Sequence, residues 1–199
     1  MSTAGSGHGA GKFRSSSERE GGSPVMSEDR FKYALNIAKV RIGEDLRTTL
    51  MIRNIPNKYT QRMVLALACE RHLGMFDFFY LPIDFKNRCN VGYAFINFAS
   101  PEFIIPFYEE FNNKKWDKFN SEKVCEITYA RIQGKAALVQ HFQSSSVMSE
   151  DKKYHPIIIN APADFTALTM LRPEDDSPLV SPVPTRHIGS PSISSHLYH

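Results

Sequence analysis

The eight residues VGYAFINF, from Val91 to Phe98, constrain the fold of this chain more than any other segment. Small or apolar side chains at the even-numbered positions alternate with Tyr93, Phe95 and Asn97, which predicts a β-strand because successive side chains point to opposite faces of a sheet. The even-numbered side chains are expected to point inward. Tyr93 and Phe95 then stand on the other face, where large rings gain nothing unless something covers them.

Composition separates a central domain from two tails. Of the 23 aromatic residues, 17 lie between residues 48 and 142, whereas residues 1–30 contain six Gly and seven Ser and residues 160–199 contain six Pro and six Ser. Segments so poor in apolar residues bury too little surface to offset the loss of chain entropy on folding. We therefore expect disordered tails at 1–30 and 160–199, a lead-in segment at 31–47, a folded domain at 48–143 and a C-terminal extension at 144–159.

The charge of the chain is modest and unevenly distributed. Residues 31–160 hold 18 Lys+Arg and 13 Asp+Glu, a net charge of +5, while the remainder holds 6 and 8, a net charge of −2; together these give the +3 of the whole chain. No apolar run is long enough to span a bilayer, and the N-terminus lacks the apolar stretch of a secretory signal. We expect no membrane partner and a location in the nucleus, the cytoplasm or both.

Nothing in the sequence points to catalysis. Cys69, Cys89 and Cys125 show neither a paired spacing nor a zinc-ligand pattern, and no nucleophile triad, metalloprotease motif or carboxylate pair occurs. An enzyme on the same scaffold, such as an acyl-phosphate hydrolase, would have only the adjacent Arg53 and Asn54 to work with. The sequence therefore predicts no enzyme activity, no cofactor, no metal and no small-molecule substrate.

The central region predicts two helices and four strands. The strands are expected at 49–55, 77–84, 91–98 and 124–131, and the helices at 61–73 and 100–112, with a bend or early break at Pro106. This β-α-β-β-α-β order predicts the ferredoxin-like α+β fold, a four-stranded antiparallel sheet. Because each helix has one apolar stripe, both should cover the same face of the sheet and leave the other open.

The open face predicts RNA binding. Val91 to Phe98 meets seven of the eight positions of the signature K/R-G-F/Y-G/A-F-V-x-F/Y of an RNA-recognition motif, allowing Ile for Val. Bases of single-stranded RNA stack on such exposed rings. Whether the rings of the second strand share this face depends on its register, since a slip of one residue exchanges the two faces. The candidate RNA-contacting residues are Tyr93, Phe95, Met51, Arg53, Tyr80, Phe78, Lys86, Arg88, Arg131 and Lys135.

Three long segments resemble one branch of these motifs, the C-terminal RNA-recognition motif of the Mei-two-like family of meiosis-regulating RNA-binding proteins. They are GEDLRTTLMIRNIPNKYT (43–60), DFFYLPIDFKNRCNVGYAFINF (77–98) and KKWDKFNSEKVCEITYARIQGKAALVQHFQ (114–143). The resemblance implies that Met51 and Val91 are features of this branch and that a third helix follows the last strand. Family members commonly carry further RNA-recognition motifs upstream, so this is either a short member or the C-terminal portion of a longer chain.

The third helix leaves two arrangements open. Ala137, Leu138, His141 and Phe142 would form its apolar stripe. Docked across the sheet, the helix would partly cover Tyr93 and Phe95. Packed at the edge, it would extend the binding surface with Lys135.

These patterns predict a non-catalytic, single-stranded RNA-binding regulatory protein, and the resemblance implies meiotic or developmental transcripts as its targets. The alternative is a protein-interaction or self-association module in which Met51 and the extra aromatic residues form a hydrophobic platform. Regulatory proteins or kinases are further candidate partners, through four Ser-Pro pairs in the tails. These begin at Ser23, Ser177, Ser181 and Ser190.

Overall fold

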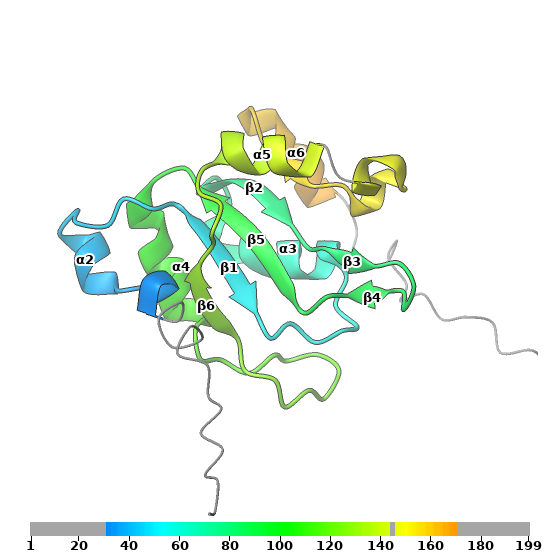
Figure 1. Ribbon diagram of the computed structural model, residues 1–199, viewed down its shortest axis with the longest axis horizontal. Helices are drawn as coiled ribbons and strands as arrows, with labels where there is room; N and C mark the ends of the chain where they lie inside the picture. Colours follow the sequence, from blue (N-terminus) through cyan, green and yellow to red (C-terminus); the bar gives the residue numbers. More distant parts are fainter. Residues whose placement is uncertain (1–30, 144–145, 171–199) are drawn as a thin grey trace, which may run out of the picture. The chain divides into compact units, whose positions relative to one another are not determined.

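The computed structural model describes residues 31–143 and 146–170, and the unit considered below begins at Tyr33. Its elements are α2 (Ile37–Arg41), β1 (Thr49–Arg53), α3 (Gln61–His72), β2 (Phe76–Tyr80), β3 (Ile83–Asp84), β4 (Cys89–Asn90), β5 (Tyr93–Phe98), α4 (Ile104–Phe111), β6 (Glu126–Tyr129), α5 (Lys135–Gln143), β7 (Ile157–Ile158) and α6 (Pro162–Met170). The succession β1-α3-β2-β5-α4-β6 confirms the predicted ferredoxin-like α+β fold (Figure 1). No helix within the described ranges is both long and apolar enough to cross a membrane.

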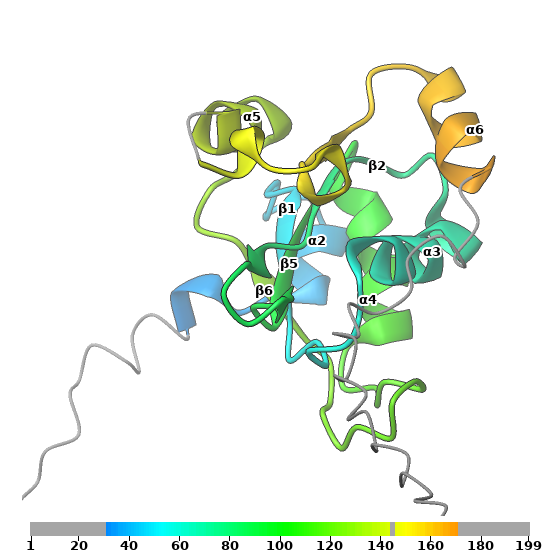
Figure 2. The same ribbon diagram turned by 90° about the vertical axis from the view of Figure 1, so that its right-hand side faces the viewer.

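The main sheet has the strand order β6-β1-β5-β2-β7, and all its neighbouring strands are antiparallel. Its inward face is apolar because the alternation of each strand is in phase with that of its neighbours. Ile52, for example, lies between Ala94 and Ile127, and all three are almost fully buried. Figure 2 shows α3 and α4 on one side of the sheet and α5 on the other. Cys125, Ile127 and Tyr129, in and next to β6, are also buried on this inward side.

Helix α3 begins where the sequence predicts it. The Thr60 side chain accepts a hydrogen bond from the Met63 amide at 3.3 Å, which satisfies one of the donors left unpaired in a first helical turn. Val64, Leu65 and Ala68 then face the sheet and are buried. The helix ends at His72, one residue before the predicted boundary.

Helix α4 corrects the prediction for Pro106. A short 3-10 turn at Pro101–Phe103 precedes the helix, which runs without a break from Ile104 to Phe111. Pro106 is therefore the third residue of the α-helix. Its missing N–H would have no acceptor within the helix anyway, so Pro is tolerated there. The expectation of a break at Pro106 is wrong because it placed the start of the α-helix too early.

The predicted strand 77–84 is divided in two. β2 ends at Tyr80, and after Leu81 and Pro82 the chain forms β3, which pairs only with β4 in a separate hairpin. Proline at this point cannot donate to a sheet ladder, which accounts for the interruption. The hairpin turn is held by Asp84, whose carboxylate accepts hydrogen bonds from the Lys86 and Asn87 amides at 2.9 and 3.1 Å.

The C-terminal extension adds a strand to the sheet. Its strand β7 pairs with β2, placing Ile158 opposite Phe78, so the sheet has five strands rather than the predicted four. The expected disordered tail is also wrong for 162–170, which form α6. Phe165 of this helix packs edge-on against Phe76, with ring centroids 5.8 Å apart. The composition of residues 160–199 as a whole concealed the apolar pair Phe165 and Leu168, which are partly buried and pack against the main core. The predicted tails at 1–30 and 171–199, with their Ser-Pro pairs, lie outside the described residues.

Gln61 attaches this extension to the domain. Its side chain is 4% exposed and makes three hydrogen bonds: Oε1 accepts from the Leu81 amide at 2.9 Å, while Nε2 donates to the Lys153 and His155 carbonyls at 3.2 and 2.9 Å. One amide group therefore links the start of α3, the end of β2 and the extension. All three of its partners are backbone groups, so the link does not depend on which other side chains are present.

Replacing Gln61 should destabilise the domain. Gln61→Leu keeps the size of the side chain but leaves the Leu81 amide without its acceptor, so we expect the free energy of unfolding to fall by about 1 to 3 kcal/mol. Urea denaturation measures the change. Glu70→Gln, on the exposed part of the same helix, is the control and should stay within about 0.5 kcal/mol of the unmodified protein. Equal stability of the two variants would contradict the role of the Gln61 amide.

Candidate nucleic-acid interface

The face of the sheet turned away from α3 and α4 carries most of the candidate residues. Met51 lies opposite Phe95 across the β1–β5 ladder, and Arg53 lies opposite Tyr93. On the other side of β5, Tyr80 is also paired with Phe95, so it shares this face. Because residues paired directly across antiparallel strands point the same way, the five side chains form one surface.

Helix α5 covers the β2 half of this surface (Figure 1). Leu138 is fully buried against Phe78 and Tyr80, which are themselves 0% and 2% exposed. Phe142 adds a ring close to three others. Its centroid lies 6.2 Å from that of Phe78 in a stacked orientation, 4.7 Å from that of Tyr80 and 5.5 Å from that of Phe95. Phe78 and Tyr80 thus lie on the expected face but beneath a helix.

The buried stripe of α5 differs from the predicted one. Leu138, Val139 and Phe142 pack against the sheet, whereas Ala137 and His141 are exposed. The prediction of Ala137 and His141 as inward residues is wrong because the helix is rotated toward Val139. Of the two arrangements left open by the sequence, the structure has the helix across the sheet.

The other half of the face remains accessible. Tyr93 and Phe95 are half-buried, and their rings meet edge to face with centroids 5.7 Å apart. Met51 is half-buried beside Phe95. Arg53 is 44% exposed, and its Nη1 lies 3.6 Å from Oε2 of Glu126, a contact too long and too solvated to hold the guanidinium firmly. This half offers two rings and a cation that can move.

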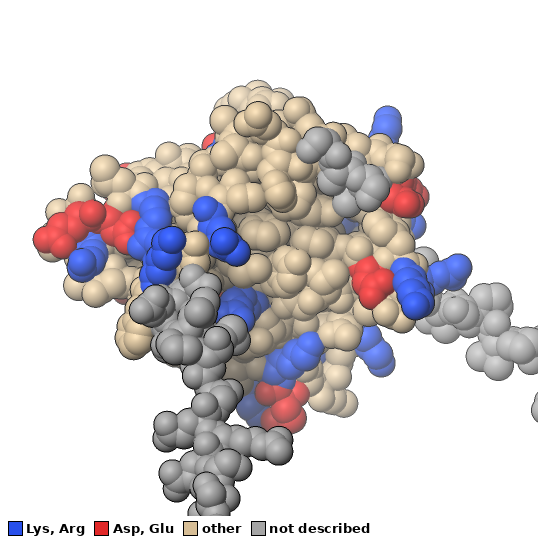
Figure 3. All heavy atoms as spheres, in the orientation of Figure 1, with Lys and Arg blue, Asp and Glu red and all other residues tan. Residues whose placement is uncertain are grey.

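The basic candidates lie around the aromatic surface and differ in their partners. Lys86 and Arg88 are exposed on the β3–β4 hairpin, and Arg131 is exposed just after β6. Lys135, by contrast, donates hydrogen bonds to the Ile159 carbonyl and, at 2.9 Å, to Oδ1 of Asn160. Its charge is engaged with the C-terminal extension. Figure 3 shows this side of the molecule as a largely uncharged area with Lys and Arg toward its margins.

A polar network at one end of this face was not predicted. Asn97 is 4% exposed; its Oδ1 accepts from the Thr48 and Thr49 hydroxyls at 2.9 and 2.7 Å, and its Nδ2 donates to Asp77 at 2.7 Å. Asn97 occupies the position of the signature at which any residue is allowed, so the motif could not predict this network. This end of the face is therefore occupied by polar groups that hydrogen-bond to one another.

Burial beneath α5 changes the chemistry of Tyr80. Desolvation, with a smaller contribution from the charge of Tyr93, raises the pKa of the Tyr80 phenol from 10.0 to about 12. The shift means that removal from water disfavours the phenolate form of this side chain. Among the described residues, no group of three His, Cys, Asp or Glu side chains is arranged to hold a metal ion.

Removing the Phe142 ring should restore the acidity of Tyr80. In Phe142→Ala, water reaches the phenol, so we expect its pKa to fall from about 12 toward 10.0. Ultraviolet titration measures it, with Tyr80→Phe in the same background identifying the signal. A pKa that stays near 12 in Phe142→Ala would contradict shielding by this ring.

The same shift predicts how stability changes at high pH. The pKa of Tyr80 is higher in the folded state than in the unfolded state. Its contribution to the stability of the fold is therefore complete below pH 10.0 and is lost as the pH rises to about 12. Burial also raises the pKa of Tyr129 to about 12, so Tyr129 should add to this loss of stability. Denaturation of Tyr80→Phe over this range should therefore show a smaller decline than the unmodified protein, and an identical decline would count against the shift.

Comparisons with known proteins agree on one family. Residues 47–143 match the model of RNA recognition motif 2. The chain is 57% identical over 147 residues to Protein MEI2-like 3 of Oryza sativa subsp. japonica, covering 74% of this chain and 15% of that protein. It is 62% identical over 135 residues to Protein MEI2-like 5 of Arabidopsis thaliana, covering 68% and 17%. The chain thus spans about a sixth of the length of these relatives.

Similar solved structures include the RNA-recognition motif of Rna15 with bound RNA (GU). The match has 16% sequence identity and a TM-score of 0.38, and it covers 49% of this chain and 97% of that one.

Proposed function

The domain at residues 47–143 belongs to the RNA recognition motif 2 family in its MEI2-like branch, and from this membership we propose that the chain binds single-stranded RNA. The observation that carries the proposal is the accessible ring pair Tyr93 and Phe95, which lies on the sheet face opposite the helices that form the core. Half-buried rings on an open sheet are suited to flat ligands. Every RNA base has a flat aromatic face, so stacking on these rings is possible for any RNA sequence.

Each part of the accessible half has a role in this proposal. Bases stack on Tyr93 and Phe95, and Met51 provides an apolar floor next to them. Arg53 leaves its weak contact with Glu126 to meet a phosphate or to stack on a base. Arg131 lies at the exit of β6, where it can accompany the RNA backbone. Since the rings provide much of the contact, binding should depend on salt less steeply than in a strongly basic protein.

The biological role extends this proposal. We propose that the bound RNAs are meiotic or developmental transcripts whose fate the protein regulates without catalysis, in the nucleus, the cytoplasm or both. The identity to MEI2-like proteins supports it. Kinases acting at the Ser-Pro pairs would be one means of control. Crosslinking the protein to RNA in cells and sequencing the bound fragments tests the choice of transcripts, and a random sample of cellular RNA would refute it.

Replacing either ring should weaken RNA binding without unfolding the domain. For Phe95→Leu and Tyr93→Leu we expect a loss of about 1 to 3 kcal/mol each, because leucine keeps apolar contact but cannot stack. Fluorescence anisotropy with a randomised single-stranded octanucleotide pool measures binding, and circular dichroism confirms folding. Tyr108→Leu, on α4, is the control and should bind as before. Unchanged binding by folded Phe95→Leu would refute stacking. Failure of the unmodified protein to bind, with light scattering that shows association, would favour the self-association module.

The salt dependence should report the arginines separately from the rings. If Arg53 meets one phosphate, Arg53→Gln should lower the slope of log affinity against log salt by about 0.7, the value for single strands. Arg131→Gln should act likewise, and Lys114→Gln, on the exposed loop after α4, is the matched control. An unchanged slope in Arg53→Gln would show that this guanidinium does not contact the backbone of the RNA.

A further inference from the structure

We propose that α5 is a fixed wall of the binding face rather than a displaceable lid, so that the domain stacks a short run of about two bases on Tyr93 and Phe95. This inference rests on the proposed function. It is carried by the way in which the turn before α5 and the first residue of α5 are fastened to the sheet and its edge. Two anchors are involved, one at the entry to the helix and one at its first residue.

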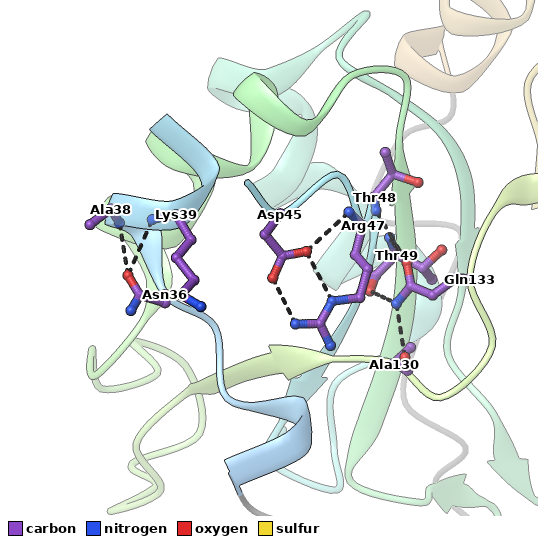
Figure 4. Close-up of polar contacts among 9 residues, drawn as sticks. All are labelled: Asn36, Ala38, Lys39, Asp45, Arg47, Thr48, Thr49, Ala130 and Gln133. Carbon is purple, nitrogen blue, oxygen red and sulfur yellow. Dashed lines mark hydrogen bonds and ion pairs between the residues drawn. The ribbon is translucent and has the colours of Figure 1, made fainter. Parts of the chain in front are cut away.

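Gln133 forms the first anchor, two residues before α5 (Figure 4). Its Oε1 accepts hydrogen bonds from the Thr48 and Thr49 amides at 3.1 and 3.0 Å. Its Nε2 donates to the Thr49 and Ala130 carbonyls at 3.0 and 2.8 Å. All four bonding positions of the amide are used, and they connect the start of β1 to the end of β6. The side chain therefore fixes the direction in which the chain leaves the sheet.

The turn into the helix is fixed as well. Gly134 adopts φ +86°, in the left-handed region that favours glycine, and its amide donates to the Thr49 hydroxyl at 2.7 Å. Its carbonyl then accepts from the Leu138 amide at 3.1 Å, so the same residue starts the helix. Rotation of α5 away from the sheet would have to change a turn whose donor and acceptor are both engaged.

Lys135 forms the second anchor. Its ammonium group binds the Ile159 carbonyl and Asn160, which follow β7 directly. Ile159 is itself 4% exposed, and its amide donates to the Asp77 carbonyl at 2.9 Å. The first residue of α5 is thus fastened to a segment that is built into the edge of β2.

The apolar contacts oppose opening too. Lifting α5 would expose its stripe of Leu138, Val139 and Phe142 together with Phe78 and Tyr80. A base that entered could replace the ring contacts of Phe78 and Tyr80 but would leave the helical stripe in water. RNA therefore gains less from the covered half than opening would cost.

Hydrogen exchange of the full chain tests the anchors without RNA. We expect the amides of 138–143 to exchange about as slowly as those of β5. Gln133→Ala should accelerate their exchange by at least about tenfold, because the entry to the helix loses four hydrogen bonds. Gln140→Ala, at an exposed position of α5, is the control and should leave exchange unchanged. Exchange of 138–143 near the unprotected rate in the unmodified protein would overturn the inference.

A second measurement follows the helix when RNA binds. With para-fluorophenylalanine at position 142, the fluorine resonance should keep its buried position when the randomised octanucleotide pool saturates the protein, and exchange of 138–143 should not increase. Movement of the resonance to the position of a solvent-exposed ring would show a lid. If the pool does not bind at all, the proposed function fails, whereas the exchange result still decides whether α5 is fixed.

Discussion

The contact of Leu138 and Phe142 with the outward face of β2 determines how much of the sheet this domain presents. Without it, the four aromatic side chains Phe78, Tyr80, Tyr93 and Phe95 would form one continuous surface. With it, two of them belong to a second, smaller core. The modest net charge of the chain fits this arrangement, because this side of the molecule is largely uncharged (Figure 3) and Arg53 lies within the accessible half.

The strands could be predicted from the sequence because alternation is a local signal. Val91 to Phe98 carried its own register, since small residues alternate with rings and only one face can hold the core. For β2 that signal was missing. Its aromatic residues would fit either face, and the register shifts between Phe76 and Phe78, an irregularity that no sequence pattern marks.

The position of α5 could not be predicted for a different reason. Its nine residues offer overlapping apolar stripes, and the choice of Val139 over His141 depends on residues far away in the sequence, which hold the N-terminal end of the helix: Thr48 and Thr49 bind Gln133, and Ile159 binds Lys135. Lys135 shows the same limit. Its charge and place suggested RNA contact, whereas its partners Ile159 and Asn160 lie on either side of the predicted boundary between the C-terminal extension and the disordered tail.

The single amide of Gln61 bears on where this domain ends. The family match stops at residue 143, yet Gln61 binds carbonyls of Lys153 and His155, and β7 occupies the outer edge of β2. A fragment cut at the family boundary would leave that edge unpaired, and bare strand edges are sites of aggregation. The folded part of the chain therefore extends beyond the family match and includes β7 and the segment that contains Lys153 and His155.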